Sequence, residues 1–334
     1  MLFSNVANAH DNFFEMSLTE LLAMEVTTVS KKAEPLSSAP GVVTVLSREE
    51  ILAFGSRNLK DVLLRLPNLY IFDSSTFVAT GVTMRSGATQ HLNNRVLYLI
   101  NGRPLRESQN GGLHTDIHLL LPVELIERIE MIRGPGSVLY GSNAFNGTIN
   151  FITREAEEEF DLEFSTYTSN EKNSGATVSL FKPLQQNGSL SLSVTKVADD
   201  GNKLNYFDEV GALGEKYSSM EGSNFNLHAS YKDFKINAML NELSIPIVSG
   251  AFQWQNLTSW TFSRNYLDIG YETDISENWQ LSVNGTHNFS QRDIEEGTSP
   301  AAYYESTTQV LDTLLTGDVS ESINLVAGVE YESI

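Results

Sequence analysis

The chain has 334 residues and a formal net charge of −20, which argues against nucleic acid as a partner because phosphate contacts need clustered Lys and Arg. Cysteine is absent, which excludes a disulfide scaffold and any site built on thiolates. No run of about 18 apolar residues occurs, so no membrane-spanning helix is predicted, but a spanning β-strand needs only about 10 alternating residues.

The first 36 residues contain two short signals. Residues 7–9, Ala-Asn-Ala, fit the cleavage pattern of a secretory signal peptide, so we expect residues 1–9 to be its remnant, with chance as the alternative for so loose a pattern. Residues 25–30, Glu-Val-Thr-Thr-Val-Ser, have extended character and precede a polar, turn-like stretch. One interpretation of this segment is an edge strand of the domain that follows.

Residues 37–155 combine short helices with short strands. Ser47 and Glu50 form a capping box that opens a helix, and Gly55 ends it. A second helix follows over residues 58–66, with one apolar face. Further strands are predicted at residues 42–46, 82–85 and 96–100. These elements predict a globular α+β domain with one small core.

Two loops of this domain, 73–94 around the strand 82–85 and 103–118, are rich in polar and aromatic residues. Solvated loops without a ligand are one interpretation of both. Within the second loop, His114, Asp116 and His118 place two imidazoles and a carboxylate within five residues. No further well-spaced ligand accompanies them, so we predict no metal site.

The stretch 121–154 contains four glycines between two predicted strands. The first strand ends at Arg133, and the second runs from about residue 148 to residue 153. Gly136 and Gly141 have the spacing of a phosphate-binding loop, but Ser-Asn follows where that loop has Lys-Ser or Lys-Thr. Nucleotide binding is therefore not predicted.

From residue 156 onward, helix periodicity gives way to an alternation of two residues. Leu190, Leu192 and Val194 lie on one face of a predicted strand whose other face carries serines. About nine strands are predicted, near residues 160–168, 175–183, 189–198, 222–231, 234–243, 260–272, 279–290, 308–318 and 322–332. Short and long links alternate between them, which is typical of a transmembrane barrel. A soluble β-sandwich gives the same alternation of faces and remains an alternative.

Several motifs in order resemble the plug signature of TonB-dependent outer-membrane receptors. They are VLYLINGRPL at 96–105, LPVELIERIE at 121–130, IRGPGSVLYGSNA at 132–144 and GTINFIT at 147–153. The resemblance implies an α+β plug domain over 37–155, after a TonB-box segment at 10–36, in the outer membrane of a Gram-negative bacterium. It also implies antiparallel transmembrane β-barrel strands over 156–334. Because the family's barrel has 22 strands, we expect an N-terminal fragment with an incomplete barrel.

The same resemblance implies roles for particular residues. The segment bound by TonB is Glu25, Val26, Thr27, Thr28, Val29 and Ser30, which would add to a sheet edge of TonB through its backbone. The candidate ligand contacts in the plug loops are Phe77, Gln90, His91, Asn93, Arg106, Gln109 and Asn110. Arg85 and Arg133 match two arginines that lock the plug to glutamates of the barrel wall. After Arg85 the chain has Ser-Gly where a direct Gly is commoner.

The function implied is TonB-dependent uptake of a scarce, bulky nutrient. A ferric siderophore is the first expectation, with cobalamin, haem or a glycan as alternatives. The expected partners are TonB, outer-membrane lipid and a small iron chelate, with no cofactor and no nucleic acid. No arrangement of a nucleophile and a base is recognisable, so no enzyme is predicted. A soluble or surface β-sandwich protein with a plug-like adaptor is the alternative of another class.

Overall fold

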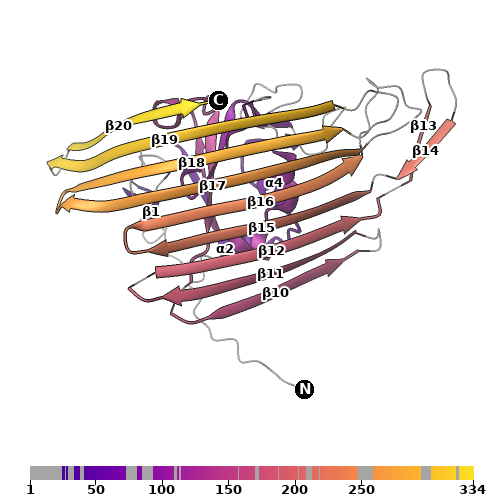
Figure 1. Ribbon diagram of the computed structural model, residues 1–334, viewed down its shortest axis with the longest axis horizontal. Coiled ribbons are helices and arrows are strands. Elements are labelled where there is room, and N and C mark those ends of the chain that lie inside the picture. The colour runs from indigo at the N-terminus through magenta and orange to yellow at the C-terminus, as the bar shows by residue number, and fades with distance from the viewer. Residues whose placement is uncertain are drawn as a thin grey trace.

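The computed structural model describes residues 25–26, 28, 34–37, 41–72, 81–84, 93–108, 111–112, 114–156, 158–169, 173–186, 188–201, 203–207, 213–217, 219–246, 259–294, 302–320 and 323–334. In this part of the chain, a mixed α/β unit lies against one face of a broad, curved sheet (Figure 1). The signal-peptide remnant predicted at residues 1–9 lies outside the described residues.

Two helices of the mixed unit begin at side-chain caps. Helix α2 (Arg48–Ala53) follows Ser47, whose hydroxyl accepts a hydrogen bond from the Glu50 amide at 3.3 Å, and the Glu50 carboxylate accepts one from the Ser47 amide at 3.0 Å. Helix α3 (Leu59–Leu63) follows Asn58, whose side-chain oxygen caps its first turn. These caps satisfy amides that lack a helical partner, and the predicted capping box is confirmed. Among the described residues, no helix is long and apolar enough to cross a membrane.

The mixed unit is built on a five-stranded sheet. Its strands, in spatial order, are β3 (Val43–Ser47), β8 (Ile126–Arg133), β9 (Gly147–Thr153), β6 (Val96–Ile100) and β7 (Arg103–Pro104). Strands β6 and β9 are parallel, and the other neighbours are antiparallel. The remaining elements are β1 (Glu25–Val26), β2 (Glu34–Pro35), β4 (Leu69–Phe72), β5 (Gly81–Met84), α4 (Thr115–Leu120) and the 3-10 helix η1 (Val123–Leu125). Apolar side chains from β6, β8 and β9 meet helices α2, α3 and α4 in the core.

Strands β8 and β9 confirm the strand, turn and returning strand predicted in the glycine-rich stretch. The turn between them contains the short helix α5 (Ser137–Tyr140). This helix ends at Gly141, whose φ of 66° lies in the left-handed region that favours glycine. At Gly147, a side chain would collide with the backbone carbonyl of Ile132. The backbone of the turn therefore requires glycine at both positions.

The second part of the described chain is a sheet of nine strands, which we call the wall sheet. Its strands are β10 (Asp161–Thr168), β11 (Asn173–Leu184), β12 (Gly188–Asp199), β15 (Met220–Tyr231), β16 (Phe234–Pro246), β17 (Ser259–Ser276), β18 (Trp279–Ile294), β19 (Ala302–Ser320) and β20 (Ile323–Ser333). Each pairs with the next in antiparallel register, so all nine predicted strands are confirmed. The domain limits drawn at residues 36 and 155 stay predictions.

The links of the wall sheet differ at its two ends. The turns between β11 and β12, β15 and β16, β17 and β18, and β19 and β20 are short and lie at the left in Figure 1. The long link after β12 runs to the other end and carries a hairpin of β13 (Lys203–Phe207) and β14 (Leu213–Tyr217), which we did not predict. Strands β13 and β14 pair with each other and project beyond the wall strands, so the alternation of polar and apolar residues in the wall strands does not extend into them.

The faces of the wall sheet are reversed relative to a soluble protein. On β17, Asp268 is 1% exposed, whereas its neighbours Leu267 and Ile269 are 41% and 48% exposed. On β12, Ser193 is 1% exposed and Val194 is 55% exposed. The polar face is thus covered by the mixed unit, and the apolar face points outward. A soluble β-sandwich buries its apolar face, so the alternation belongs to a wall that faces lipid.

Candidate functional site

The contact between the mixed unit and the wall sheet combines polar and charged groups with an apolar cluster, in which Leu120 of α4 packs against wall residues such as Leu243 and Phe262. A buried part of it is Asp116 of α4, whose carboxylate accepts hydrogen bonds from Arg264 Nε at 2.8 Å and Nη2 at 3.2 Å. Asn241 of β16 donates to the same carboxylate at 2.9 Å. Burial alone would raise the pKa of Asp116, but the charge and hydrogen bonds of Arg264 outweigh it and hold that pKa below its usual value.

The loop predicted over 103–118 is wrong at its end, where helix α4 begins at Thr115 and buries Ile117 and Leu120. His114 and His118 of this region enclose Tyr98 of β6. His114 stacks on the Tyr98 ring with centroids 4.9 Å apart, and a hydrogen bond of 2.7 Å joins His118 Nε2 to the Tyr98 hydroxyl. Burial, helped by the positive charge of Arg264, lowers the pKa of His114 well below its ordinary value. In the described part of the chain, no group of three or more His, Cys, Asp or Glu side chains is arranged to hold a metal.

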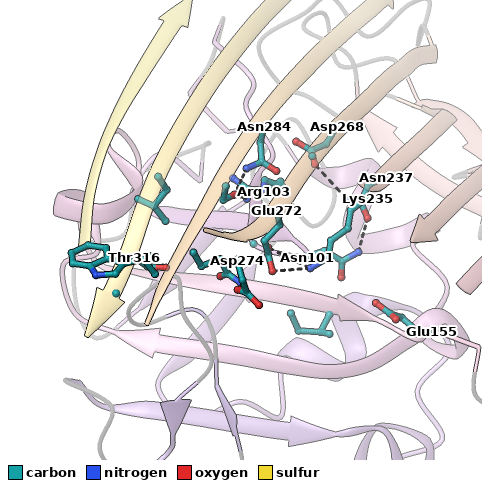
Figure 2. A pocket seen from close by; sticks show the side chains of 18 of the residues that line it. Asn101, Arg103, Glu155, Lys235, Asn237, Asp268, Glu272, Asp274, Asn284 and Thr316 are labelled. Carbon is teal, nitrogen blue, oxygen red and sulfur yellow. Dashed lines mark hydrogen bonds and ion pairs between the residues drawn. The ribbon is translucent and has the colours of Figure 1, made fainter. Parts of the chain in front are cut away.

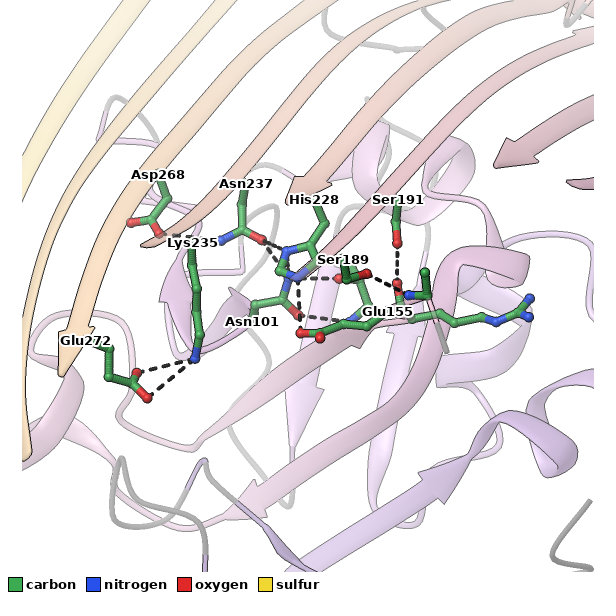
Figure 3. A network of polar contacts seen from close by, with 12 residues as sticks. Asn101, Glu155, Ser189, Ser191, His228, Lys235, Asn237, Asp268 and Glu272 are labelled. Carbon is green, nitrogen blue, oxygen red and sulfur yellow. Dashed lines mark hydrogen bonds and ion pairs between the residues drawn. The ribbon is translucent and has the colours of Figure 1, made fainter. Parts of the chain in front are cut away.

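A second contact with the wall lies at the turn between β6 and β7. The Asn101 side-chain amide donates to Asn237 at 2.7 Å and to Thr153 at 2.8 Å, and His228 completes this network with a 2.7 Å contact to Asn237 (Figure 3). Arg103, two residues further along the chain, forms an ion pair with Asp312 of β19 at 3.0 Å. The asparagine-glycine turn therefore fixes β6 to the wall.

A cavity of about 780 Å³ lies beside this turn, between Asn101 and Arg103 on one side and strands β16 to β19 on the other. Figure 2 shows the charged side chains around it, among them Asp268, Glu272 and Asp274. Because its lining is polar and charged, the cavity suits water and polar solutes.

A third contact involves Arg106, one of the predicted ligand contacts. Its backbone amide donates to Asn288 of β18 at 3.0 Å, and its guanidinium donates to the carbonyls of Ser142 at 2.7 Å and Tyr140 at 2.9 Å. Glu330 of β20 lies 3.6 Å from the same guanidinium. Arg106 is 4% exposed, so it positions the glycine turn against the wall, and its contact with a ligand stays a prediction.

The other predicted ligand contacts are placed only in part. Asn93 is 1% exposed, and its side-chain oxygen accepts from the Val96 amide at 3.2 Å. The remaining five candidates, Phe77, Gln90, His91, Gln109 and Asn110, lie outside the described residues. None of these roles is tested by this geometry.

The predicted lock is likewise described at only one of its two arginines. Arg133 donates from Nη2 to the hydroxyl of Thr44 at 3.1 Å, inside the mixed unit, and Arg85 lies outside the described residues. The described ion pairs between the mixed unit and the wall include those of Asp116, Arg103 and Arg106, which were not predicted to contact the wall. The lock stays a prediction.

The N-terminal segment is folded into the mixed unit where it is described. Val26 is fully buried beside Ile132 and belongs to β1, which pairs with β2 rather than with the five-stranded sheet. Thr28 is 1% exposed, and its amide and hydroxyl donate to Glu130 at 3.0 Å and 2.5 Å. The predicted positions Thr27, Val29 and Ser30, and the side chain of Glu25, lie outside the description.

Tyr140 joins this segment to the glycine turn. Its hydroxyl donates to the Thr28 carbonyl at 2.8 Å, while its own carbonyl accepts from Arg106. Asn150 of β9 donates to the Thr28 hydroxyl at 3.0 Å. Thr28 is therefore held by β8, β9 and α5 at once.

Comparison with known families decides what this architecture is. The family model described as TonB-dependent Receptor Plug Domain matches residues 35–148, which contain most of the mixed unit. The chain belongs to the family of TonB-dependent receptors. The mixed unit is accordingly the plug of the receptor, and the wall sheet is a part of its β-barrel.

Curated relatives of the receptor carry two kinds of name. The chain is 29% identical over 214 residues to the vitamin B12 transporter BtuB of Vibrio vulnificus. This alignment covers 62% of the chain and 34% of that protein. The chain is 30% identical over 168 residues to an iron-regulated outer membrane virulence protein of Vibrio cholerae, in an alignment that covers 48% of the chain and 25% of that protein. The chain thus spans a quarter to a third of the length of these relatives.

Solved structures share the fold of the receptor. The ferric-catecholate import receptor Fiu of E. coli K12 matches with a TM-score of 0.65 and 16% identity, over 93% of this chain and 52% of that one. BauA, the ferric preacinetobactin receptor of Acinetobacter baumannii, matches with a TM-score of 0.67 and 13% identity, over 93% and 49%. The receptor is an outer-membrane protein, and its family consists of transport receptors and not of enzymes.

Proposed function

We propose that the receptor takes up a scarce, bulky nutrient, a ferric siderophore, across the outer membrane when TonB pulls on residues 25–30. The observation that carries this proposal is the meeting of two functional segments on Tyr140. Its hydroxyl donates to Thr28 of the TonB segment at 2.8 Å, and its carbonyl accepts from Arg106, a candidate ligand contact, at 2.9 Å. Movement of Thr28 or of Arg106 would therefore act directly on Tyr140 and on the glycine turn that contains it.

The coupling would follow from these contacts. A pull on Thr28 breaks its hydrogen bonds to Glu130 and Tyr140, and this leaves a buried carboxylate without two of its donors. Because the Arg106 amide is bonded to Asn288 of the wall, movement of Tyr140 also loosens the plug from β18. The proton gradient of the inner membrane would supply the energy through TonB.

The siderophore is supported by the names of the relatives. The Vibrio cholerae relative is iron-regulated, and Fiu and BauA import or receive ferric chelates. A second candidate nutrient is cobalamin, because the vitamin B12 transporter of Vibrio vulnificus aligns over 214 residues of the chain, more than the iron-regulated relative does.

The function is tested by growth of a strain that lacks the gene. A ferric catecholate, ferripyoverdine and cyanocobalamin serve as single sources of iron or of the vitamin, and the wild-type gene is restored on a plasmid. We expect one iron chelate to support growth only with the gene, and a variant without residues 25–30 to bind that chelate at the cell surface without growth. Growth on cyanocobalamin alone would favour cobalamin, and growth unaffected by the deletion of residues 25–30 would contradict TonB-dependent uptake.

A further inference from the structure

The cavity beside the turn 101–103 lies at the end of the wall where the short turns are. Its lining follows the ends of β16, β17, β18 and β19 and includes Glu277 and Asn278 of the turn between β17 and β18. Short turns of bacterial outer-membrane barrels face the periplasm. A solute that passes the plug on this side therefore meets the cavity last.

Carboxylates outnumber cations around this cavity. The six acidic residues of the lining are Glu155, Asp268, Glu272, Asp274, Glu277 and Asp318. The cations of the lining are Arg103, Arg128 and Lys235. They come from the plug and from β16, whereas most of the carboxylates come from the wall strands and their turns.

The two arginines are bonded to carboxylates outside the lining. Arg103 bonds Asp312 at 3.0 Å, and Arg128 bonds Glu130 at 2.8 Å. Lys235 bonds Glu272 of the lining at 3.4 Å. The lining therefore keeps an excess of negative charge, and a cleft with walls of low dielectric constant concentrates the field of such charge.

We propose that this cavity is a charge-selective exit compartment, which admits cationic and neutral solutes and repels anions. Its volume of about 780 Å³ falls within the range of about 300–1,000 Å³ that small-molecule sites have. The proposal rests on the uptake function proposed above and adds that the nutrient enters the periplasm in a neutral or cationic form. It assigns selectivity to the periplasmic side of the plug, separate from nutrient binding on the other side.

The charge of the cavity is measured with single cysteine reporters, since the chain has no cysteine of its own. Ser282→Cys places a thiol in the lining of the cavity, and Gln185→Cys places one in an exposed turn at the same end, outside the lining. The receptor in isolated outer-membrane fragments is treated with trimethylammonium or sulfonate methanethiosulfonate reagents. The rate of each reagent is divided by its rate with a free thiol. On this scale, we expect the cationic reagent to react about tenfold faster than the anionic one at residue 282, and the two reagents to react equally fast at residue 185.

Matched charge changes identify the source of this preference. In the Ser282→Cys background, Asp274→Asn with Glu277→Gln should lower the ratio of rates several-fold. Glu158→Gln with Glu159→Gln removes two exposed carboxylates at the same end but outside the lining, and should leave the ratio unchanged. Higher salt should reduce the ratio, because mobile ions screen exposed charge.

Three results would overturn the proposal. The first is equal rates of the two reagents at residue 282, and the second is a faster reaction with the anionic reagent. The third is that Ser282→Cys is not labelled whereas Ser276→Cys, at the open end of the lining, is labelled. A shift in gel mobility on heating shows that each variant is assembled. Labelling requires neither nutrient nor TonB, so its failure is distinguishable from a failure of the growth experiment.

Discussion

Asp116 of the plug and Arg264 of the wall form an ion pair that neither side exposes to water. The guanidinium Nε lies 2.8 Å from the carboxylate, and the two side chains are 3% and 4% exposed. The pair joins helix α4 to strand β17, so it ties the centre of the plug directly to the barrel. A buried charge that loses its partner stays desolvated, so each residue depends on the other.

We predict that Asp116→Asn lowers the free energy of plug unfolding by about 3–5 kcal/mol, because the buried Arg264 then loses the carboxylate that accepts its hydrogen bonds at 2.8 and 3.2 Å. Urea denaturation of the receptor in detergent measures the change. The double variant Asp116→Leu with Arg264→Met is the control, since replacing both charges by apolar groups of similar size recovers most of the loss. A single variant as stable as wild type would show that other contacts hold the plug.

The stability of the plug should fall on mild acidification because of His114. Burial lowers its pKa in the folded plug below the ordinary value of about 6.5, so below pH 6.5 the unfolded chain binds a proton that the folded plug does not. The free energy of unfolding should then drop by up to about 1.4 kcal/mol per pH unit, down to the folded pKa. Asp116 has a lowered pKa, so its contribution is lost only below its ordinary value near 3.8.

Denaturation at pH 7.5, 6.5, 5.5 and 4.5 measures this slope. In His114→Phe, an aromatic ring remains against Tyr98 but no proton is taken up, so the slope contributed by this residue should disappear. An equal slope in wild type and variant would assign the pH dependence to another group.

Thr28 should control how tightly the N-terminal segment is held. Thr28→Val removes the hydroxyl that donates to Glu130 and accepts from Asn150, and leaves the buried carboxylate with one donor fewer. We expect the attachment to weaken by about 1–3 kcal/mol, so a thiol introduced by Glu25→Cys should react faster with a maleimide. Thr28→Ser keeps the hydroxyl and should behave like wild type, whereas equal rates in all three proteins would show that the backbone contacts suffice.

The local patterns of the sequence predicted most of the fold. The capping box at Ser47, the glycine turn after Arg133 and the nine wall strands each depend on a few neighbouring residues, and each is present. The β13–β14 hairpin was missed, because five-residue strands that pair only with each other leave little periodicity.

The contacts across the plug and wall could not be predicted in the same way. Asp116 and Arg264 are 148 residues apart, and alternation shows which face of β17 is polar but not which plug residue it meets. Arg133 was assigned to the wall by resemblance, and that assignment stays a prediction beside the hydrogen bond that Arg133 donates to Thr44 inside the plug. The extended character of residues 25–30 could be predicted from the sequence. The burial of Val26 could not, because it depends on Ile132, which is distant in sequence.

The outward face of the wall predicts where a charge is not tolerated. Ile269 lies near the middle of β17 and is 48% exposed on the apolar face. We expect Ile269→Arg to destabilise the barrel by about 2–4 kcal/mol, because an arginine near the midplane of the bilayer is poorly solvated. The temperature at which the folded band disappears from a gel should fall, and the amount of receptor in the outer membrane should fall with it. Ile269→Phe keeps the face apolar and Gln185→Arg adds the same charge in an exposed turn, so neither should have this effect. An Ile269→Arg receptor with wild-type heat resistance would mean that β17 does not face lipid.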